Sequence, residues 1–283
     1  MKKWLTFLAA LTVAFVISAC GTSDEGSEGE NAGGGDEAET TTLKVGASNV
    51  PHAEILEEAK PLLEEKGIEL DITPFQDYIM PNKTLESGEI DANYFQHIPY
   101  LDLQIEENGY DFVNAGAIHI EPMGIYSQEY KSLDELPDGA TIIMSNSVAE
   151  HGRILSLLEK EGVIKLKEGI DKTNAQIEDI VENSKNIKLD TDYEPSLLPQ
   201  IYNNGEGDAV VINSNYAIDA GLDPINDSIA IEGEESPYAN IITVRSEDKD
   251  SEAIKTLVEV LRSKEIQDFI LEEYKGAVVP VTE

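Results

Sequence analysis

Six short clusters of amide, imidazole, hydroxyl and aromatic side chains are the parts of this chain best suited to chemistry. They are Ser48-Asn-Val-Pro-His52, Asn93-Tyr-Phe-Gln-His97, His119-Ile-Glu-Pro122, Ser145-Asn146, Asn213-Ser-Asn-Tyr216 and Ser236-Pro-Tyr-Ala-Asn240. Open α/β sheets bind ligands outside the carboxyl ends of their strands, where these clusters are expected. Each cluster alone is compatible with ordinary turn chemistry, because Asn, Ser and Pro are common turn residues. Together they supply groups suited to a small zwitterion.

Arg153 stands beside one of these clusters and follows Gly152. We expect it in the first turn of a helix over 152–161, where the helix dipole disfavours a cation. A guanidinium at that place is explained if a ligand carboxylate docks between it and the backbone N–H groups. The alternative is an exposed arginine paired with Glu150 or another acid, and spacing alone leaves both open.

The chain contains none of the common catalytic motifs. It has no GxGxxG, GxxxxGK[ST], GxSxG, HExxH or CxxC. The four histidines (His52, His97, His119 and His151) include no pair at metal-ligand spacing, so we expect structural roles for them and no metal site. Acidic residues are so frequent that two of them close in the sequence do not indicate a catalytic pair unless the distance between their carboxylates is known. An enzyme is therefore unsupported, and no cofactor is indicated.

Cys20 is the only cysteine, and it ends the stretch Ile17-Ser-Ala-Cys20. Lys2 and Lys3 and an apolar run from Trp4 to Ile17 precede it, which is the pattern of a secretory signal peptide over 1–19. The run is short for a bilayer span, which needs about 20 apolar residues. Small residues before a cysteine are also the pattern of a bacterial lipobox, so we expect Cys20 to be lipidated. An ordinary secreted protein with a single thiol is the alternative.

Charge and composition narrow the partners of the chain. The formal net charge is −36, and removal of the signal peptide makes it about −38. So acidic a surface repels nucleic acid and anionic headgroups. Residues 21–42 have no large apolar side chain and seven acids without a base, so they cannot form a core and are expected to be a disordered tether behind the lipidated cysteine, over 20–42 in all. From Leu43 onward the composition is globular.

Hydrophobic periodicity predicts alternating strands and helices over 43–283. Strands are expected over 43–48, 68–73, 92–96, 112–120, 141–144, 187–189, 209–212, 228–231 and 241–244. Helices are expected from Pro51 to Gly67, near 83–88, over 99–108 and 152–161, near 175–182 and 197–202, and as one long amphipathic helix over 252–273. A capping box at 132–135 opens a short helical turn. Such βαβ alternation predicts a parallel sheet, as one large sheet or as two α/β lobes.

The polar clusters and their flanks give the chain a family resemblance. The stretches VPHAEIL (50–56), PNKTLESGEIDANYFQHIPYLD (81–102), HIEPMGIYS (119–127), GRILSLLEKEGVIKLKEG (152–169), INSNYAIDAGL (212–222) and SPYANII (236–242) resemble the NlpA/MetQ-type methionine-binding lipoproteins. The resemblance runs in order over nearly all of 43–283, and the lipobox agrees with it.

This resemblance implies an α/β type II periplasmic-binding-protein fold, with two lobes joined by two crossovers and a ligand cleft between them. Lobe 1 would be 43–123 plus 240–283, and lobe 2 would be 124–239. The chain would be a monomeric receptor, anchored by lipid to the extracytoplasmic face of the cell membrane. It would capture methionine and deliver it to an ABC permease with its separate ATPase, and would itself catalyse nothing.

The resemblance also implies the ligand-binding residues. They are Tyr94, Phe95, His97, His119, Glu121, Tyr126, Asn146, Arg153, Asn213 and Asn240. Arg153 would hold the ligand carboxylate, the two asparagines Asn213 and Asn240 would hold its polar end, and aromatic walls would suit a thioether.

One loop departs from the family pattern. The family often has Asn-Asp-Pro-Ser/Thr-Asn before the Gly-Arg pair, whereas this chain has Asn146-Ser-Val-Ala-Glu150, with Glu150 in place of the second asparagine. L-methionine, D-methionine, a methionine-containing dipeptide or another small amino acid therefore all remain as ligands. A lipid-anchored surface enzyme and a surface adhesin on the same fold are alternatives from other classes.

Overall fold

The computed structural model describes residues 40–233 and 236–281, which belong to the compact unit Ala38–Glu283. The signal peptide, Cys20 and nearly all of the tether lie outside the described residues. In the described part, no helix combines the length and the apolarity that crossing a membrane requires.

A six-stranded mixed sheet contains the first strands of the unit and its last ones. Its order is β13-β4-β12-β3-β1-β2, from β1 (Thr41–Ser48), β2 (Ile68–Phe75), β3 (Ala92–His97), β4 (Phe112–Ile120), β12 (Ala239–Arg245) and β13 (Val279–Pro280). Strand β1 runs parallel to both neighbours, with Val45 opposite Ile72 and Ala92. Strand β12 runs antiparallel to β3 and β4, so a late segment of the chain closes a sheet that the early segments begin.

Helices cover both faces of this sheet because its strands are apolar on both sides. Ile242 and Val244 of β12 pack in one core with α1 (Glu54–Glu64), α7 (Glu252–Leu261) and α8 (Lys264–Tyr274). The preceding residue, Ile241, packs in a second core with Leu85 of α2 (Met80–Glu86) and Leu101 of α3 (Ile98–Asn108). Alternate residues of a strand point to opposite faces, so the two helix groups lie on opposite sides of the sheet.

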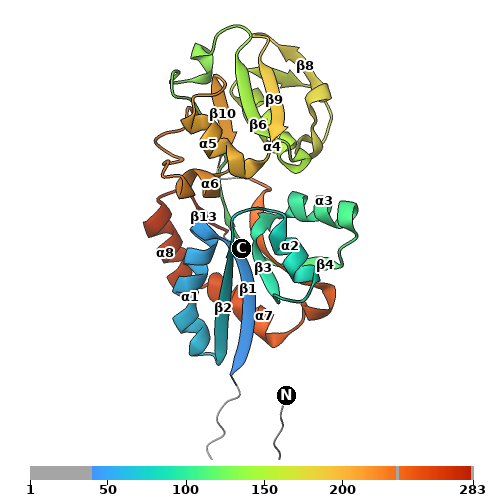
Figure 1. Cartoon of the computed structure of the whole chain (residues 1–283), viewed down its shortest axis with the longest axis vertical. Helices are drawn as coiled ribbons and strands as arrows, with labels where there is room; N and C mark the ends of the chain where they lie inside the picture. The colour runs from blue at the N-terminus through green and yellow to red at the C-terminus, as the bar shows by residue number, and fades with distance from the viewer. Residues whose placement is uncertain (1–39, 234–235, 282–283) are drawn as a thin grey trace, which may run out of the picture. The chain divides into compact units, whose positions relative to one another are not determined.

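A separate five-stranded sheet is formed by the middle of the chain (Figure 1). Its order is β11-β5-β10-β6-β9, from β5 (Gly124–Tyr126), β6 (Thr141–Ser145), β9 (Lys188–Tyr193), β10 (Ala209–Ile212) and β11 (Ala230–Ile231). Strand β10 is central, as its apolar sequence predicts. One face packs on α4 (Val148–Lys160), and the other packs on α5 (Leu198–Asn203) and α6 (Ser214–Asp219).

Two short segments carry the chain between the sheets. The first crossover, residues 121–123, joins β4 to β5, and the second, of which residues 232–233 and 236–238 are described, joins β11 to β12. The chain therefore passes twice between two α/β units, as the family resemblance of the sequence implies. Each crossover contributes a carboxylate to the site described below, Glu121 from the first and Glu232 from the second.

Several expectations about secondary structure were wrong. The short turn Leu133–Glu135 forms without the expected capping box, because the Ser132 side chain makes no capping hydrogen bond. The sheets are mixed and not parallel. The segment near 175–182 is not a helix: after two short 3-10 turns, β8 (Ile180–Asn183) pairs antiparallel with β7 (Ile164–Leu166), and this pairing overrides the helical spacing. The long helix over 252–273 is two helices, because the Ser263 hydroxyl accepts the backbone N–H of Ile266 and begins α8 afresh.

Candidate functional site

A cavity lies where the end of β3, the first crossover and the starts of α4 and α6 meet. It is lined by Tyr78, Phe95, Gln96, His97, Tyr100, Glu121, Glu150, Arg153, Asn213, Ser214, Asn215 and Asn240. The six-stranded sheet supplies Phe95, His97 and Asn240, and the segments around the five-stranded sheet supply Glu150, Arg153 and Asn213. The cavity therefore joins residues that are far apart in the sequence.

One wall of the cavity is aromatic. Phe95 lies 6.0 Å from both Tyr78 and Tyr100, measured between ring centroids. The Tyr100 hydroxyl donates to the carbonyl oxygen of Tyr78 at 2.9 Å, and the Tyr78 hydroxyl donates to Oδ1 of Asn215 at 2.6 Å. These bonds hold the ring edges in place while the ring bodies remain available to an apolar ligand group.

A buried amide network supports β3 from behind. All six residues of β3 are buried, including the polar Asn93 and Gln96. Gln96 Nε2 donates to Oδ1 of Asn82 at 2.9 Å, and Asn82 Nδ2 donates to Gln96 Oε1 at 3.1 Å. Because these amides satisfy one another, a polar strand can be buried without loss and can end at the cavity.

His97 is fixed as a donor toward the cavity. It is the N-cap of α3, and its Nδ1 accepts the backbone N–H of Tyr100 at 3.2 Å. Nε2 therefore carries a proton and donates to Oε1 of Glu150 at 2.6 Å. Burial alone would raise the pKa of Glu150, but His97 and Arg153 outweigh it and lower that pKa to about 2. Glu150 is therefore an anion in the cavity wall at neutral pH.

Arg153 contacts both crossovers. Its Nη2 donates to the Glu121 carbonyl oxygen at 2.9 Å and to the Glu232 carboxylate, while Nη1 lies 3.5 Å from Oε2 of Glu150. The guanidinium also lies over the ring of Tyr238, 4.7 Å from its centroid. Burial alone would lower the pKa of Arg153, but these carboxylates raise it above its usual value, so the side chain stays charged.

The expectation that Arg153 lies in the first turn of its helix was wrong. Helix α4 begins at Val148, after Ser147 in extended conformation, so Arg153 is in the second turn and Glu150 is in the first. The acid therefore stands where the helix dipole favours an anion. Arg153 is 5 % exposed, so it is not the surface arginine of the alternative interpretation, although it does lie near Glu150.

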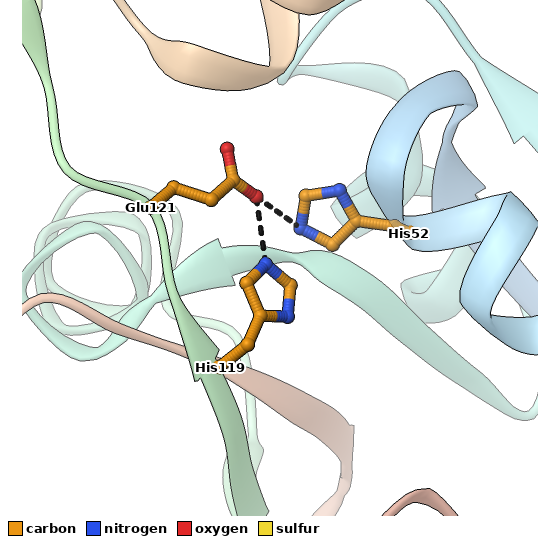
Figure 2. A group of neighbouring side chains, drawn as sticks. All are labelled: His52, His119 and Glu121. Atoms are coloured by element: carbon orange, nitrogen blue, oxygen red, sulfur yellow. Dashed lines mark hydrogen bonds and ion pairs between the residues drawn. The ribbon is translucent and has the colours of Figure 1, made fainter. Parts of the chain in front are cut away.

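Glu121 is the centre of a second buried cluster, which Figure 2 shows together with His52 and His119. Oε1 of Glu121 accepts a hydrogen bond from Nε2 of His119 at 2.8 Å and lies 3.2 Å from Nε2 of His52. Oε2 accepts the backbone N–H of Asn215 at 3.0 Å. Burial raises the pKa of Glu121 and lowers the pKa of His52 to about 4 and that of His119 to about 3. Both imidazoles are therefore neutral at pH 7.

This cluster orients Asn240 and engages Tyr94. The Nε2 atom of His52 lies 2.9 Å from Oδ1 of Asn240, and the Tyr94 hydroxyl contacts Nδ1 of His119. Since His52 donates to Oδ1, the Nδ2 of Asn240 is left as the donor of that amide. The cluster thus presents Asn240 to the cavity in one orientation.

His52, His119 and Glu121 are also the described residues that could hold a metal ion, because their ligand atoms all lie within 4.8 Å of one another. The sequence spacing gave no sign of this group. The Nε2 atoms that would bind a metal already contact Oε1 of Glu121. Their contacts with one another form a hydrogen-bonded support for the cavity wall.

The predicted site residues fall into two groups. Phe95, His97, Glu121, Arg153, Asn213 and Asn240 line the cavity, whereas Tyr94, His119, Tyr126 and Asn146 do not. Tyr94 and His119 lie behind Glu121. Tyr126 is fully buried in the apolar core beside α5, because its side chain faces that layer of the five-stranded sheet. Asn146 is exposed, since the chain turns outward after Ser145.

The sequence reasoning missed several residues of the cavity as site residues. Ser214 and Asn215 follow Asn213 in one of the six clusters, and Glu150 was noticed only as a departure from the family pattern. Tyr78 and Tyr100 have no local signal in the sequence, because their rings reach the cavity through the fold. The contribution of the Asn215 backbone N–H could not be predicted either, because it does not depend on the type of side chain.

Known proteins resemble this chain in sequence and in fold. A family model of NlpA lipoproteins matches residues 43–282. The chain is 50% identical over 287 residues to the methionine-binding lipoprotein MetQ of Bacillus subtilis (strain 168), covering 100% of both chains. It is 38% identical over 247 residues to the D-methionine-binding lipoprotein MetQ of Escherichia coli (strain K12), covering 87% of this chain and 90% of that one.

A solved structure is also similar. It is that of a nutrient binding protein from Burkholderia cenocepacia bound to methionine, with a TM-score of 0.80 and 42% identity over 85% of this chain and 100% of that chain. The predicted fold class, that of periplasmic substrate-binding proteins, is thereby confirmed. These relatives are named for binding and not for catalysis, so the family is one of substrate-binding proteins and not of enzymes. The chain belongs to the NlpA lipoprotein family.

Proposed function

We propose that this protein is the methionine-binding receptor of an ABC importer. The observation that carries the proposal is the cavity, which combines an aromatic wall with a charged end, in a chain 50% identical along its whole length to a methionine-binding lipoprotein. Phe95, Tyr78 and Tyr100 suit a thioether, because sulfur packs favourably at ring edges. Arg153 and the amides suit the ionic end of an amino acid.

The proposal assigns the ligand contacts to residues that line the cavity. The ligand carboxylate would meet Arg153 and the Nδ2 donor of Asn240, and the side chain would lie along Phe95. Tyr94 and His119 would act through Glu121, as positioning residues. Tyr126 and Asn146 have no part in ligand contact.

Capture of the ligand would use the two lobes defined from the sequence, 43–123 with 240–283 and 124–239. The first crossover begins within two residues of this boundary, and the second crossover ends at it. Movement at the two crossovers would open the cavity, and closing would complete it around the guest.

Delivery would take place at the membrane. After removal of a signal peptide at 1–19, Cys20 would be lipidated, and the acidic tether up to residue 42 would hold the monomeric receptor on the extracytoplasmic face. The partners would be a membrane permease and its ATPase. The named relatives are lipoproteins, which supports this anchoring.

Thermal unfolding with and without ligand tests the function. At a ligand concentration 100 times the dissociation constant, binding adds about 2.7 kcal/mol to the free energy of unfolding, so the melting temperature rises. L-methionine, D-methionine and methionyl dipeptides are compared at one concentration, with glutamate as a control. If none of the three methionine ligands raises the melting temperature, the proposal is wrong.

Arg153→Ala and Arg153→Lys test the polar end of the cavity. Loss of the guanidinium should weaken methionine binding by roughly 2–5 kcal/mol, because a buried ligand carboxylate loses its ionic partner. Calorimetry measures the affinity, and Lys165→Ala, at an exposed position on β7, is the control. Unchanged affinity in a folded Arg153→Ala variant would remove Arg153 from the ligand site.

A further inference from the structure

Two buried polar atoms of the cavity lining have no hydrogen-bond partner, and they are of opposite kinds. Nε of Arg153 is a donor, and Oδ1 of Asn213 is an acceptor. Both side chains line the cavity, and the two residues are only 5 % and 8 % exposed. Buried polar groups are normally hydrogen-bonded. The lining therefore calls for a guest that carries both an acceptor and a donor.

The charges of the lining say which donor is needed. Arg153 is the one arginine or lysine of the cavity lining, and it lies between two carboxylates: Glu232, which lies outside the lining, and Glu150, 3.5 Å from Nη1. Glu150 is an anion inside the wall. One guanidinium cannot offset both carboxylates, and a buried charge that is not offset is costly, so the donor that completes the cavity is a cation.

Glu150 and Asn213 are placed to receive that cation together. Oε1 of Glu150 is held at 2.6 Å by Nε2 of His97, but Oε2 has only long contacts, 3.5 Å to Nδ2 of Asn213 and 3.5 Å to Nη1 of Arg153. A carboxylate offers about four lone-pair sites, so Oε2 retains acceptor capacity. Since Asn213 turns its Nδ2 toward Glu150, its free acceptor Oδ1 belongs to the same neighbourhood.

We propose that Glu150, with Oδ1 of Asn213, is the subsite for the α-ammonium group of the ligand. The cavity then takes amino acids, or dipeptides with a free amino terminus, and rejects ligands whose amine is acylated or missing. This inference rests on the proposed function, because it concerns the same cavity.

A ligand series on the unmodified protein tests the proposal first. Calorimetry compares L-methionine with N-acetyl-L-methionine and with 4-(methylthio)butanoate, which keeps the thioether and carboxylate but has no amine. The last compound is smaller than methionine, so a loss of affinity for it is not steric. We expect both analogues to bind roughly 10- to 100-fold more weakly or worse. Equal affinity for 4-(methylthio)butanoate and methionine would overturn the proposal.

Glu150→Gln then assigns the selectivity to one side chain. It keeps the shape of Glu150 but removes the charge, so methionine should bind roughly 10- to 100-fold more weakly while 4-(methylthio)butanoate changes little. The ratio of the two affinities therefore shrinks. Glu161→Gln, at the exposed residue that follows α4, should leave the ratio unchanged. An unchanged ratio in a folded Glu150→Gln variant overturns the assignment.

The outcomes separate this inference from the proposed function. If no thioether ligand binds the unmodified protein, the methionine receptor itself is wrong. If methionine binds but the amine-free analogue binds equally well, only the ammonium subsite is wrong. Circular dichroism establishes whether Glu150→Gln folds, and the ligand series on the unmodified protein decides the matter when it does not.

Discussion

Neutral imidazoles buried beside a carboxylate make the site sensitive to acid. His52 contacts Glu121 and Asn240, and His119 contacts Glu121 and Tyr94. Desolvation lowers the pKa values of these histidines to about 4 and about 3. A histidine in the unfolded chain has a pKa near 6.5. Between that pH and the lower pKa of the folded state, the unfolded chain therefore binds protons at these histidines and the folded chain does not.

The expected consequence is a loss of stability as the pH falls from 6.5 toward 4. In that window the unfolded state binds more protons, so the free energy of unfolding decreases; above pH 6.5 the contribution of the histidines is fully present. His52 alone accounts for a loss of about 3 kcal/mol, from a shift of 6.5 to about 4. Chemical denaturation at several pH values measures it.

His52→Gln isolates this effect from the titration of the many carboxylates. The variant keeps an amide donor near Asn240 but cannot take a proton, so its stability should fall less steeply than that of the unmodified protein below pH 6.5. His151→Gln is the comparison at a histidine outside this cluster. Parallel curves for His52→Gln and the unmodified protein would contradict the assigned shift.

At the scale of single residues, the sequence indicated the chemistry better than the exact contacts. Phe95, His97 and Asn240 could be assigned because they belong to recognisable clusters at strand ends. Tyr126 could not be excluded in advance, because which face of β5 it occupies depends on pairing with β10 and β11. In the sequence, Glu150 stood out only as a departure from the family pattern, yet it forms part of the cavity wall. Its partner there, His97, lies 53 residues away in the sequence, so no local pattern could show the contact.

Helix α4 is the element on which the site depends most. It carries Glu150 in its first turn and Arg153 in its second, and Gly152 lies between them against the 3-10 turn Lys172–Asn174. A Cβ at Gly152 would lie 2.1 Å from the carbonyl oxygen of Thr173 and 2.6 Å from that of Lys172. Both are backbone atoms, so the contact cannot be relieved by a side chain turning away.

Gly152→Ala should therefore destabilise the protein, although alanine is about 1 kcal/mol better than glycine within a helix. We expect a net loss of at least 1–3 kcal/mol, a typical cost of overpacking, and weaker methionine binding because both flanking charges shift. Denaturant unfolding and calorimetry measure the two effects. Ser156→Ala, half-buried on the same helix, should change neither by more than about 0.5 kcal/mol. Greater stability in Gly152→Ala would contradict the close packing.

At the scale of elements, the sequence predicted strands and helices where local patterns agree with the fold. Strand β4 and helix α3 were predicted within one residue of their bounds. The errors come from interactions between distant segments. Strand β8 exists because β7 pairs with it. The antiparallel position of β12 between β3 and β4 follows from the return of the chain through the second crossover, which no local pattern shows.

The whole molecule carries 56 acidic residues against 20 basic ones, a formal net charge of −36. Like charges at this density repel one another and oppose the compact state, and salt screens that repulsion over about 10 Å at 0.1 M. The buried pairs at the cavity are screened much less than the surface.

Sodium chloride should therefore stabilise the protein. Between 0.01 and 0.5 M salt, the melting temperature should rise by at least about 2–4 °C, the shift that 1 kcal/mol produces in a chain of this size. Differential scanning calorimetry at pH 7 measures it, with sucrose at matched osmolality as the uncharged control. A melting temperature that falls with salt would mean that surface ion pairs outweigh the repulsion.

The two hydrogen bonds of the Arg153 Nη2 atom have a mechanical consequence. One reaches the carbonyl of Glu121 and the other the carboxylate of Glu232, so a single side chain ties together the two strands of backbone on which the molecule would hinge. Movement of either crossover would shift the guanidinium and would thereby change its contact with the other crossover. A guest that draws the guanidinium toward itself would thus alter the contacts of both crossovers in the same step. Filling of the cavity and closure of the two lobes would then occur together, and a partner that recognises the closed form would bind only the loaded receptor.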